Sequence, residues 1–166
     1  MKTLILVRHA KSSWDDVNLP DFDRPLNKRG KEDAPKMAHR LQTKISKLDA
    51  ILSSPAKRAK KTAESFAEAF KIKEKEIIYI PSLYHASGTD FINAIKELSD
   101  KLNTVALFSH NPGITYFVNE LVPDVQIDNV PTTSVFAVKI DTANWSDFIS
   151  AKKEFLFFDY PKNSSD

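Results

Sequence analysis

The sequence predicts an α/β protein with a mostly parallel sheet and helices on both of its faces. Short apolar runs alternate with longer amphipathic segments along the 166 residues, which is the pattern of parallel strands joined by helical connections. Hydrophobic residues make up 42% and charged residues 28% of the chain, an ordinary globular composition. The length fits a single domain over residues 1–166.

Six apolar runs are expected to form the strands of this sheet. Residues 3–7 begin the chain with a short β-branched run that suits a buried strand, and three similar runs follow. The six expected strands cover residues 3–7, 49–53, 77–80, 104–108, 134–140 and 154–159. Residues 163–166 are expected to be a polar tail.

Four amphipathic segments are expected to form helices between these strands. They cover residues 27–45, 55–70, 88–102 and 112–121, and their apolar side chains recur at helical spacing. Ser54-Pro55 and Asn111-Pro112 each predict an N-cap followed by proline at the first helical position. Ser87 and Asp90 have the spacing of a capping box.

Composition excludes several classes of function. The absence of cysteine excludes disulfides, thiolate zinc sites and cysteine nucleophiles, and no HExxH motif is present, so we expect no metal. Three glycines without a GxGxxG or P-loop motif predict no nucleotide cofactor, and a net charge of +2 predicts no nucleic-acid partner. No run of about 18 apolar residues occurs, and the first apolar run is too short for a signal peptide. We therefore expect no membrane association and a cytoplasmic location.

Cationic side chains follow three of the predicted strands. Arg8 and His9 come directly after the first strand, Arg58 lies just after the second, and His110 follows the strand over residues 104–108. Because ligands bind at the carboxyl ends of parallel strands, we expect these four side chains to meet at one edge of the sheet. Two helix N-termini would lie at the same edge, and their free N–H groups also suit an anion.

Such a cluster has the chemistry of a phosphoryl-transfer site without a metal. Arginine forks match phosphate oxygens, and a histidine among them can act as a nucleophile, while a second histidine stabilises charge. Each residue taken alone also fits a solvent-exposed cation, as does the basic run over residues 57–61. His39 is expected to be an ordinary, partly exposed residue of a helix, and His85 lies in a loop that follows the third strand.

Four motifs that contain these residues resemble the histidine phosphatase superfamily, which includes phosphoglycerate mutase. They are residues 6–12 (LVRHAKS), 25–30 (PLNKRG), 53–62 (SSPAKRAKKT) and 109–113 (SHNPG), and they occur in the order typical of that superfamily. Within it, the forms RHAKSSW and HNPG are most similar to the SixA-type phosphohistidine phosphatases.

The resemblance implies a three-layer α/β/α sandwich and assigns roles to the four residues. His9 would be the nucleophile that is transiently phosphorylated, and Arg8, Arg58 and His110 would bind the phosphoryl group of the substrate. The implied substrate is protein phosphohistidine. No metal or other cofactor is implied.

The general acid of many superfamily members is missing from its expected place. Where they carry a glutamate, this chain has Leu83-Tyr84-His85, so the acid is absent or replaced by His85. Phosphohistidine expels imidazole, which is a far better leaving group once the phosphorylated ring carries a proton, so loss of the acid is better tolerated; a phosphomonoester gains about 10²–10⁴-fold from one. Two alternatives remain open: a phosphatase for small phosphorylated molecules, and a non-catalytic module that binds phosphate.

Overall fold

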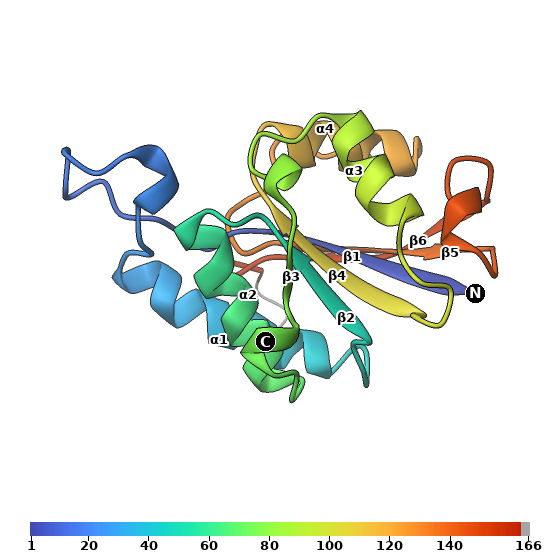
Figure 1. Cartoon of the computed structure of the whole chain (residues 1–166), viewed down its shortest axis with the longest axis horizontal. Helices are drawn as coiled ribbons and strands as arrows, with labels where there is room; N and C mark the ends of the chain where they lie inside the picture. Colours follow the sequence, from blue (N-terminus) through green and yellow to red (C-terminus); the bar gives the residue numbers. More distant parts are fainter. Residues whose placement is uncertain (164–166) are drawn as a thin grey trace.

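The computed structural model describes residues 1–163 and contains one six-stranded sheet between two pairs of helices (Figure 1). The strands are β1 (Lys2–Arg8), β2 (Ala50–Ser53), β3 (Ile78–Tyr79), β4 (Thr104–Ser109), β5 (Val135–Ile140) and β6 (Lys153–Asp159). The helices are α1 (Lys28–Gln42), α2 (Lys57–Ala69), α3 (Gly88–Lys96) and α4 (Gly113–Leu121). The predicted three-layer α/β/α architecture is confirmed. The tail expected at 163–166 lies outside the described residues, except for Asn163.

The strands of the sheet follow the order β3-β2-β4-β1-β5-β6. The first four of these strands are parallel to one another, whereas β5 is antiparallel to both β1 and β6. The prediction of a mostly parallel sheet is therefore confirmed. In the register of the sheet Arg8 lies beside Ser109, and Ser53 lies beside Phe108, so the carboxyl ends of β1, β2 and β4 share one edge.

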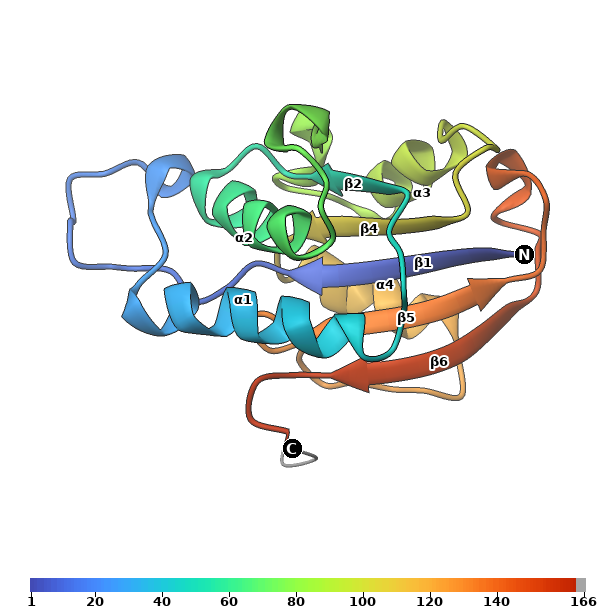
Figure 2. The same ribbon diagram turned by 90° about the horizontal axis from the view of Figure 1, so that it is seen from below.

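Strand β1 is buried on both faces, which explains its continuous apolar run. Leu4 and Leu6 pack into the core formed with α3 and α4, where Phe117 is 2% exposed. Ile5 and Val7 point to the opposite face and pack into the core under α1 and α2. Figures 1 and 2 show the two helix pairs on opposite sides of the sheet.

Two helices begin later than predicted because their expected caps bind elsewhere. Helix α2 begins at Lys57, and the Ser54 hydroxyl contacts the ring of His110 as well as the backbone N–H of Ala56. Helix α4 begins at Gly113, and the Asn111 side chain instead bonds to the segment before β5 and to a residue within α4. Neither proline occupies a first helical position, so the prediction was wrong at both starts.

The other two helix starts agree with the sequence. The Asn27 side chain accepts a hydrogen bond from the backbone N–H of Gly30 at 2.8 Å and caps α1. Ser87 and Asp90 form the predicted capping box of α3. Both helices are shorter than predicted at their carboxyl ends, since α1 ends at Gln42 and α3 at Lys96.

The loop between β1 and α1 projects beyond the edge of the sheet where the carboxyl strand ends meet (Figures 1 and 2). It contains a short 3-10 helix, Asp21–Asp23. Its base packs closely on α1, because a Cβ atom on Gly30 would overlap the carbonyl oxygen of Lys11. Among residues 1–163, no helix combines the length and the apolar character that crossing a membrane requires.

Candidate active site

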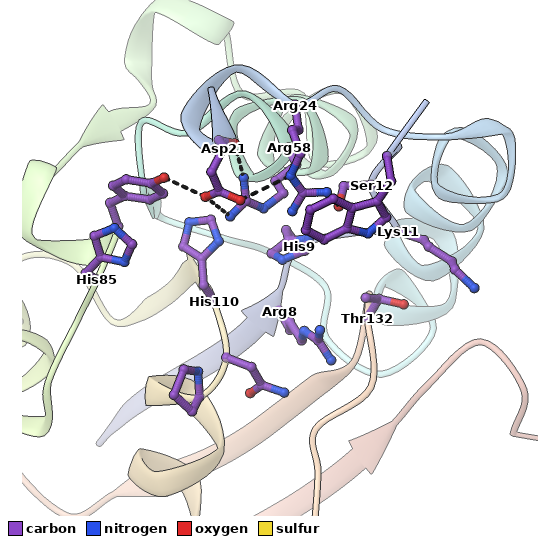
Figure 3. Close-up of a pocket in the computed structure, with 14 residues that line it drawn as sticks. Arg8, His9, Lys11, Ser12, Asp21, Arg24, Arg58, His85, His110 and Thr132 are labelled. Atoms are coloured by element: carbon purple, nitrogen blue, oxygen red, sulfur yellow. Dashed lines mark hydrogen bonds and ion pairs between the residues drawn. The ribbon is translucent and has the colours of Figure 1, made fainter. Parts of the chain in front are cut away.

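A cavity of about 580 Å³ lies at the edge where β1, β2 and β4 end. Arg8, His9, Arg58 and His110 all line it, so the structure brings the four predicted residues together (Figure 3). They reach it from different parts of the chain. Arg8 and His9 lie at the end of β1, Arg58 in the first turn of α2, and His110 just after β4.

The His9 ring is held with one nitrogen free for chemistry. Its Nδ1 atom lies 2.7 Å from the carbonyl oxygen of Ala10, which can only accept, so Nδ1 donates a proton and Nε2 carries the lone pair. The ring is 6% exposed. Burial, together with the charges of Arg58 and Arg8, lowers the pKa of His9 to about 3, against the opposing effect of the Ala10 bond. His9 is therefore neutral near pH 7 and has a nucleophilic Nε2.

His110 faces His9, with the two ring centroids 5.0 Å apart. Its Nε2 atom lies 2.7 Å from the Ser54 hydroxyl, and its Nδ1 atom is buried without a hydrogen-bond partner. Burial lowers the pKa of His110, and the neighbouring His9 and Arg58 act in the same direction. An unpartnered buried nitrogen costs free energy, and a bound ligand would remove that cost.

The two arginines differ in how they are held. Arg8 donates from Nη1 to the Val130 carbonyl at 2.8 Å. Arg58 donates from Nη1 to the backbone oxygen of Asp21 at 2.7 Å and from Nη2 to its carboxylate at 3.0 Å. Both Nε atoms are buried without a partner. The pair thus offers unused donors and positive charge, which is what a phosphoryl group binds.

The backbone that carries Arg8 and His9 is fixed from two sides. The Thr62 hydroxyl accepts from the N–H of Ala10 at 2.8 Å. The N–H of Thr133 donates to the carbonyl oxygens of Arg8 and His9, at 3.0 and 3.1 Å. Thr133 has a φ of 61°, a strained conformation for a β-branched residue. Such strain persists where surrounding contacts impose it, and here it lies beside the backbone of Arg8 and His9.

The sequence did not reveal a carboxylate that enters the cavity from the projecting loop. Asp21 accepts hydrogen bonds from the Tyr84 hydroxyl at 2.5 Å, from Arg58 and from Arg24 Nε at 3.1 Å. The bond from Tyr84, followed by those from the two arginines, holds the pKa of Asp21 well below its usual range. Loop residues lack periodicity, so the one available signal was the acidic and basic pairing within DFDR, residues 21–24.

The remaining singled-out residues fall into two groups. His85 lines the cavity at its outer side and packs its ring on Tyr84, with centroids 3.9 Å apart; its role as an acid stays a prediction. His39 is exposed on α1, as expected. The lysines of residues 57–61 are exposed on α2 and do not line this cavity. Across residues 1–163, no group of three or more His, Cys, Asp or Glu side chains is placed to hold a metal ion.

Comparison with known families agrees with this geometry. The sequence model of the histidine phosphatase superfamily (branch 1) matches residues 4–86, half of the chain. This segment contains Arg8, His9, Asp21 and Arg58. The chain belongs to the histidine phosphatase superfamily.

Curated relatives carry several names. An uncharacterised chloroplast protein of Arabidopsis thaliana is 38% identical over 120 residues, which cover 68% of this chain and 55% of the relative. Phosphohistidine phosphatase SixA of Escherichia coli is 24% identical over 149 residues, 86% of this chain and 91% of the relative. Phosphoserine phosphatase 1 of Hydrogenobacter thermophilus is 45% identical over 85 residues, 48% of this chain and 39% of the relative. The chain spans only 55%, 66% and 63% of the lengths of the first three relatives.

Solved structures share the fold over nearly the whole chain. A protein of Agrobacterium tumefaciens assigned as phosphohistidine phosphatase SixA superposes with a TM-score of 0.81 at 25% identity. The match covers 96% of this chain and 98% of that protein.

Proposed function

We propose that this protein is a metal-independent phosphatase that forms a phosphohistidine intermediate on His9, with protein phosphohistidine as its substrate. The observation that carries the reaction is the hydrogen bond from His9 Nδ1 to Ala10, which leaves Nε2 unprotonated on a ring that lines the cationic cavity. Membership of the histidine phosphatase superfamily supports the same reaction.

The reaction has two steps that the cavity can support. In the first, His9 Nε2 attacks phosphorus, the new P–N bond forms, and the bond from phosphorus to the substrate atom breaks with its electron pair on that atom. In the second, the oxygen of water attacks phosphorus, the P–N bond breaks with its electron pair on Nε2, and inorganic phosphate leaves with the protons of that water, which restores His9. Arg8, Arg58 and His110 bind the phosphoryl oxygens and stabilise the charge that spreads over them in both transition states.

The choice of substrate follows from the acids that the cavity offers. Asp21 is the one carboxylate among its described lining residues, and its pKa is held below the usual range, so it is ionised near neutral pH. An alkoxide leaving group needs a proton from an acid, whereas a protonated phosphohistidine brings its own. The relatives named SixA add support for phosphohistidine.

A direct comparison of substrates tests this proposal. We expect kcat/KM on a phosphohistidine peptide to exceed that on a matched phosphoserine peptide and on a sugar phosphate by at least about a hundredfold, the range of one catalytic acid. His9→Ala is expected to abolish turnover of all three, and His39→Ala, on the exposed face of α1, is expected to leave it unchanged. Full activity of His9→Ala would overturn the mechanism.

A small phosphomonoester is the second candidate substrate. The segment that resembles Phosphoserine phosphatase 1 favours it, as do the Tyr84 hydroxyl and His85 at the outer side of the cavity, where a leaving oxygen could receive a proton. Equal or higher rates on the phosphoserine or sugar substrates would select this alternative. Binding of phosphate with no turnover and no phosphorylated enzyme would instead indicate a non-catalytic module.

A further inference from the structure

Asp21 is an unusual residue for a site that binds anions. It is the only carboxylate among the described residues that line the cavity, and it carries a negative charge beside Arg24 and Arg58. Its Oδ2 atom accepts from Tyr84 and Arg58, and its Oδ1 atom accepts from Arg24. A carboxylate oxygen accepts about two hydrogen bonds, so Oδ1 keeps a free lone pair for another donor.

Exposure places Asp21 nearer the mouth of the cavity than the imidazoles. His9 and His110 are each 6% exposed at its base, whereas the Asp21 side chain is 47% exposed. Figure 3 shows the Asp21 carboxylate above the rings of His9 and His110 and beside Arg58, and the Tyr84 hydroxyl donates to it. A phosphoryl group seated against His9 must therefore direct its leaving group outward, past Asp21.

A fixed negative charge at this position separates two classes of substrate. When a phosphate ester reacts with His9, the bridging oxygen takes the electron pair of the P–O bond and gains negative charge, which a nearby carboxylate opposes. A phosphoimidazole protonated on its second ring nitrogen is cationic there. When its P–N bond breaks, the electron pair moves to the ring, which leaves as neutral imidazole with its N–H retained. The carboxylate attracts the cationic phosphoimidazole and can accept a hydrogen bond from its N–H.

We propose that Asp21 is a specificity-determining residue, whose carboxylate selects phosphoryl groups on a protonated nitrogen heterocycle over phosphoryl groups on oxygen. This inference rests on the phosphatase reaction proposed above. Tyr84, Arg24 and Arg58 hold the carboxylate ionised and in place. Because it is ionised, Asp21 acts by its charge and as a hydrogen-bond acceptor, and it does not donate a proton to the leaving group.

The test compares kcat/KM for phosphoimidazole and for phenyl phosphate in variants of the whole protein. Asp21→Asn keeps the shape of the side chain and removes its charge. We expect the ratio of kcat/KM for phosphoimidazole to kcat/KM for phenyl phosphate to fall at least tenfold. Asp23→Asn removes the same charge from the same 3-10 helix outside the cavity lining, and the ratio should stay within twofold. Tyr84→Phe removes one hydrogen bond to Asp21 but keeps the carboxylate charge. It should lower both values without a comparable change in their ratio.

The outcomes separate this inference from the reaction itself. If Asp21→Asn lowers both values in the same proportion, Asp21 merely positions Arg58 and the inference is overturned, while the reaction on His9 stands. If no phosphoryl group is transferred from substrate to His9 in the wild-type protein, the proposed function itself is overturned. Should the asparagine variant not fold, as judged by thermal unfolding, Asp21→Ser carries the same comparison with a smaller neutral side chain.

Discussion

The two ends of strand β1 each carry a buried or partly buried cation, and the two cations differ in how fully their hydrogen-bond donors are used. Lys2, at the amino end, is 2% exposed and donates to the carbonyl oxygens of Asp100 and Leu102 and to the Asn103 side chain, at 2.5 to 3.0 Å. Arg8, at the carboxyl end, contacts one backbone carbonyl and keeps a buried Nε atom without a partner.

This contrast indicates which buried charge is structural and which is functional. A cation with all its donors used is part of the fold, because its desolvation is offset by its partners. A cation with unused donors is completed only when a ligand binds. The four unpartnered buried side-chain atoms of the described chain all lie at or beside the cavity: Arg8 Nε, Arg58 Nε, His110 Nδ1 and Thr133 Oγ1.

The largest effects are expected from substitution of these two cations. Arg8→Ala is expected to lower kcat/KM by about 10²–10³-fold, as for the loss of one transition-state donor, with little change in the free energy of unfolding. Lys2→Met should do the reverse and cost about 1–3 kcal/mol of stability, since three acceptors lose their donor. Steady-state kinetics and urea denaturation of both variants check this; equal losses of activity and of stability in both would contradict it.

A second prediction concerns the loop that follows His9. Gly30→Ala should destabilise the protein by about 1–3 kcal/mol through overpacking and lower activity, because the new methyl group would displace the backbone of Lys11. Gly88→Ala is the matched control, since its Cβ would meet only the flexible Glu120 side chain at 3.6 Å. Thermal unfolding and activity of the two variants measure the difference. A Gly30→Ala protein as stable and active as Gly88→Ala would show that the close contact does not hold the loop.

The buried histidines should make stability depend on pH. His9 has a folded pKa of about 3, below its ordinary 6.5, and that of His110 is also lowered, so the unfolded chain binds more protons between these values. Stability is therefore full above pH 6.5 and falls as the pH drops, by about 1.4 kcal/mol per unit for each histidine. Urea denaturation at pH 7.5 and pH 5 measures this. A His9→Asn variant should show a smaller dependence, and a flat profile in wild type would rule out buried neutral histidines.

The smallest effect is expected at a left-handed residue far from the cavity. Lys71, with φ of 60°, follows α2, and its N–H and that of Ile72 close the helix end onto Glu68 and Ala67. Glycine is preferred there, so Lys71→Gly should raise stability by about 1 kcal/mol with unchanged activity. Thr133→Gly, at the other left-handed position, keeps the N–H that bonds to the carbonyl oxygens of Arg8 and His9 but frees the backbone that carries it. The looser backbone should hold Arg8 and His9 less firmly and lower activity severalfold. Calorimetry with activity assays separates the two.

Much of the architecture could be predicted from the sequence because strands and helices have periodic patterns. Arg8, His9, Arg58 and His110 were identified because each lies within a few residues of a strand end, and parallel strands bring those ends together. The alternation of apolar runs and amphipathic segments was sufficient to predict three layers.

The remainder depended on contacts between distant segments. Asp21 reaches the cavity from a loop without regular structure, and its partner Tyr84 lies 63 residues away. The Ser54 hydroxyl was expected to cap a helix but contacts His110, 56 residues further along the chain. Local propensity cannot report such pairings, so the residues missed are those whose role depends on the tertiary structure.

Trapping the phosphorylated enzyme is the most direct test of a phosphohistidine intermediate on His9. Wild-type protein would be mixed with a phosphohistidine donor, quenched in base, digested and analysed by mass spectrometry. We predict one added phosphoryl group on His9, stable in base and lost in acid, and none in His9→Ala. Phosphate on another residue, or turnover without any phosphorylated protein, would contradict the account.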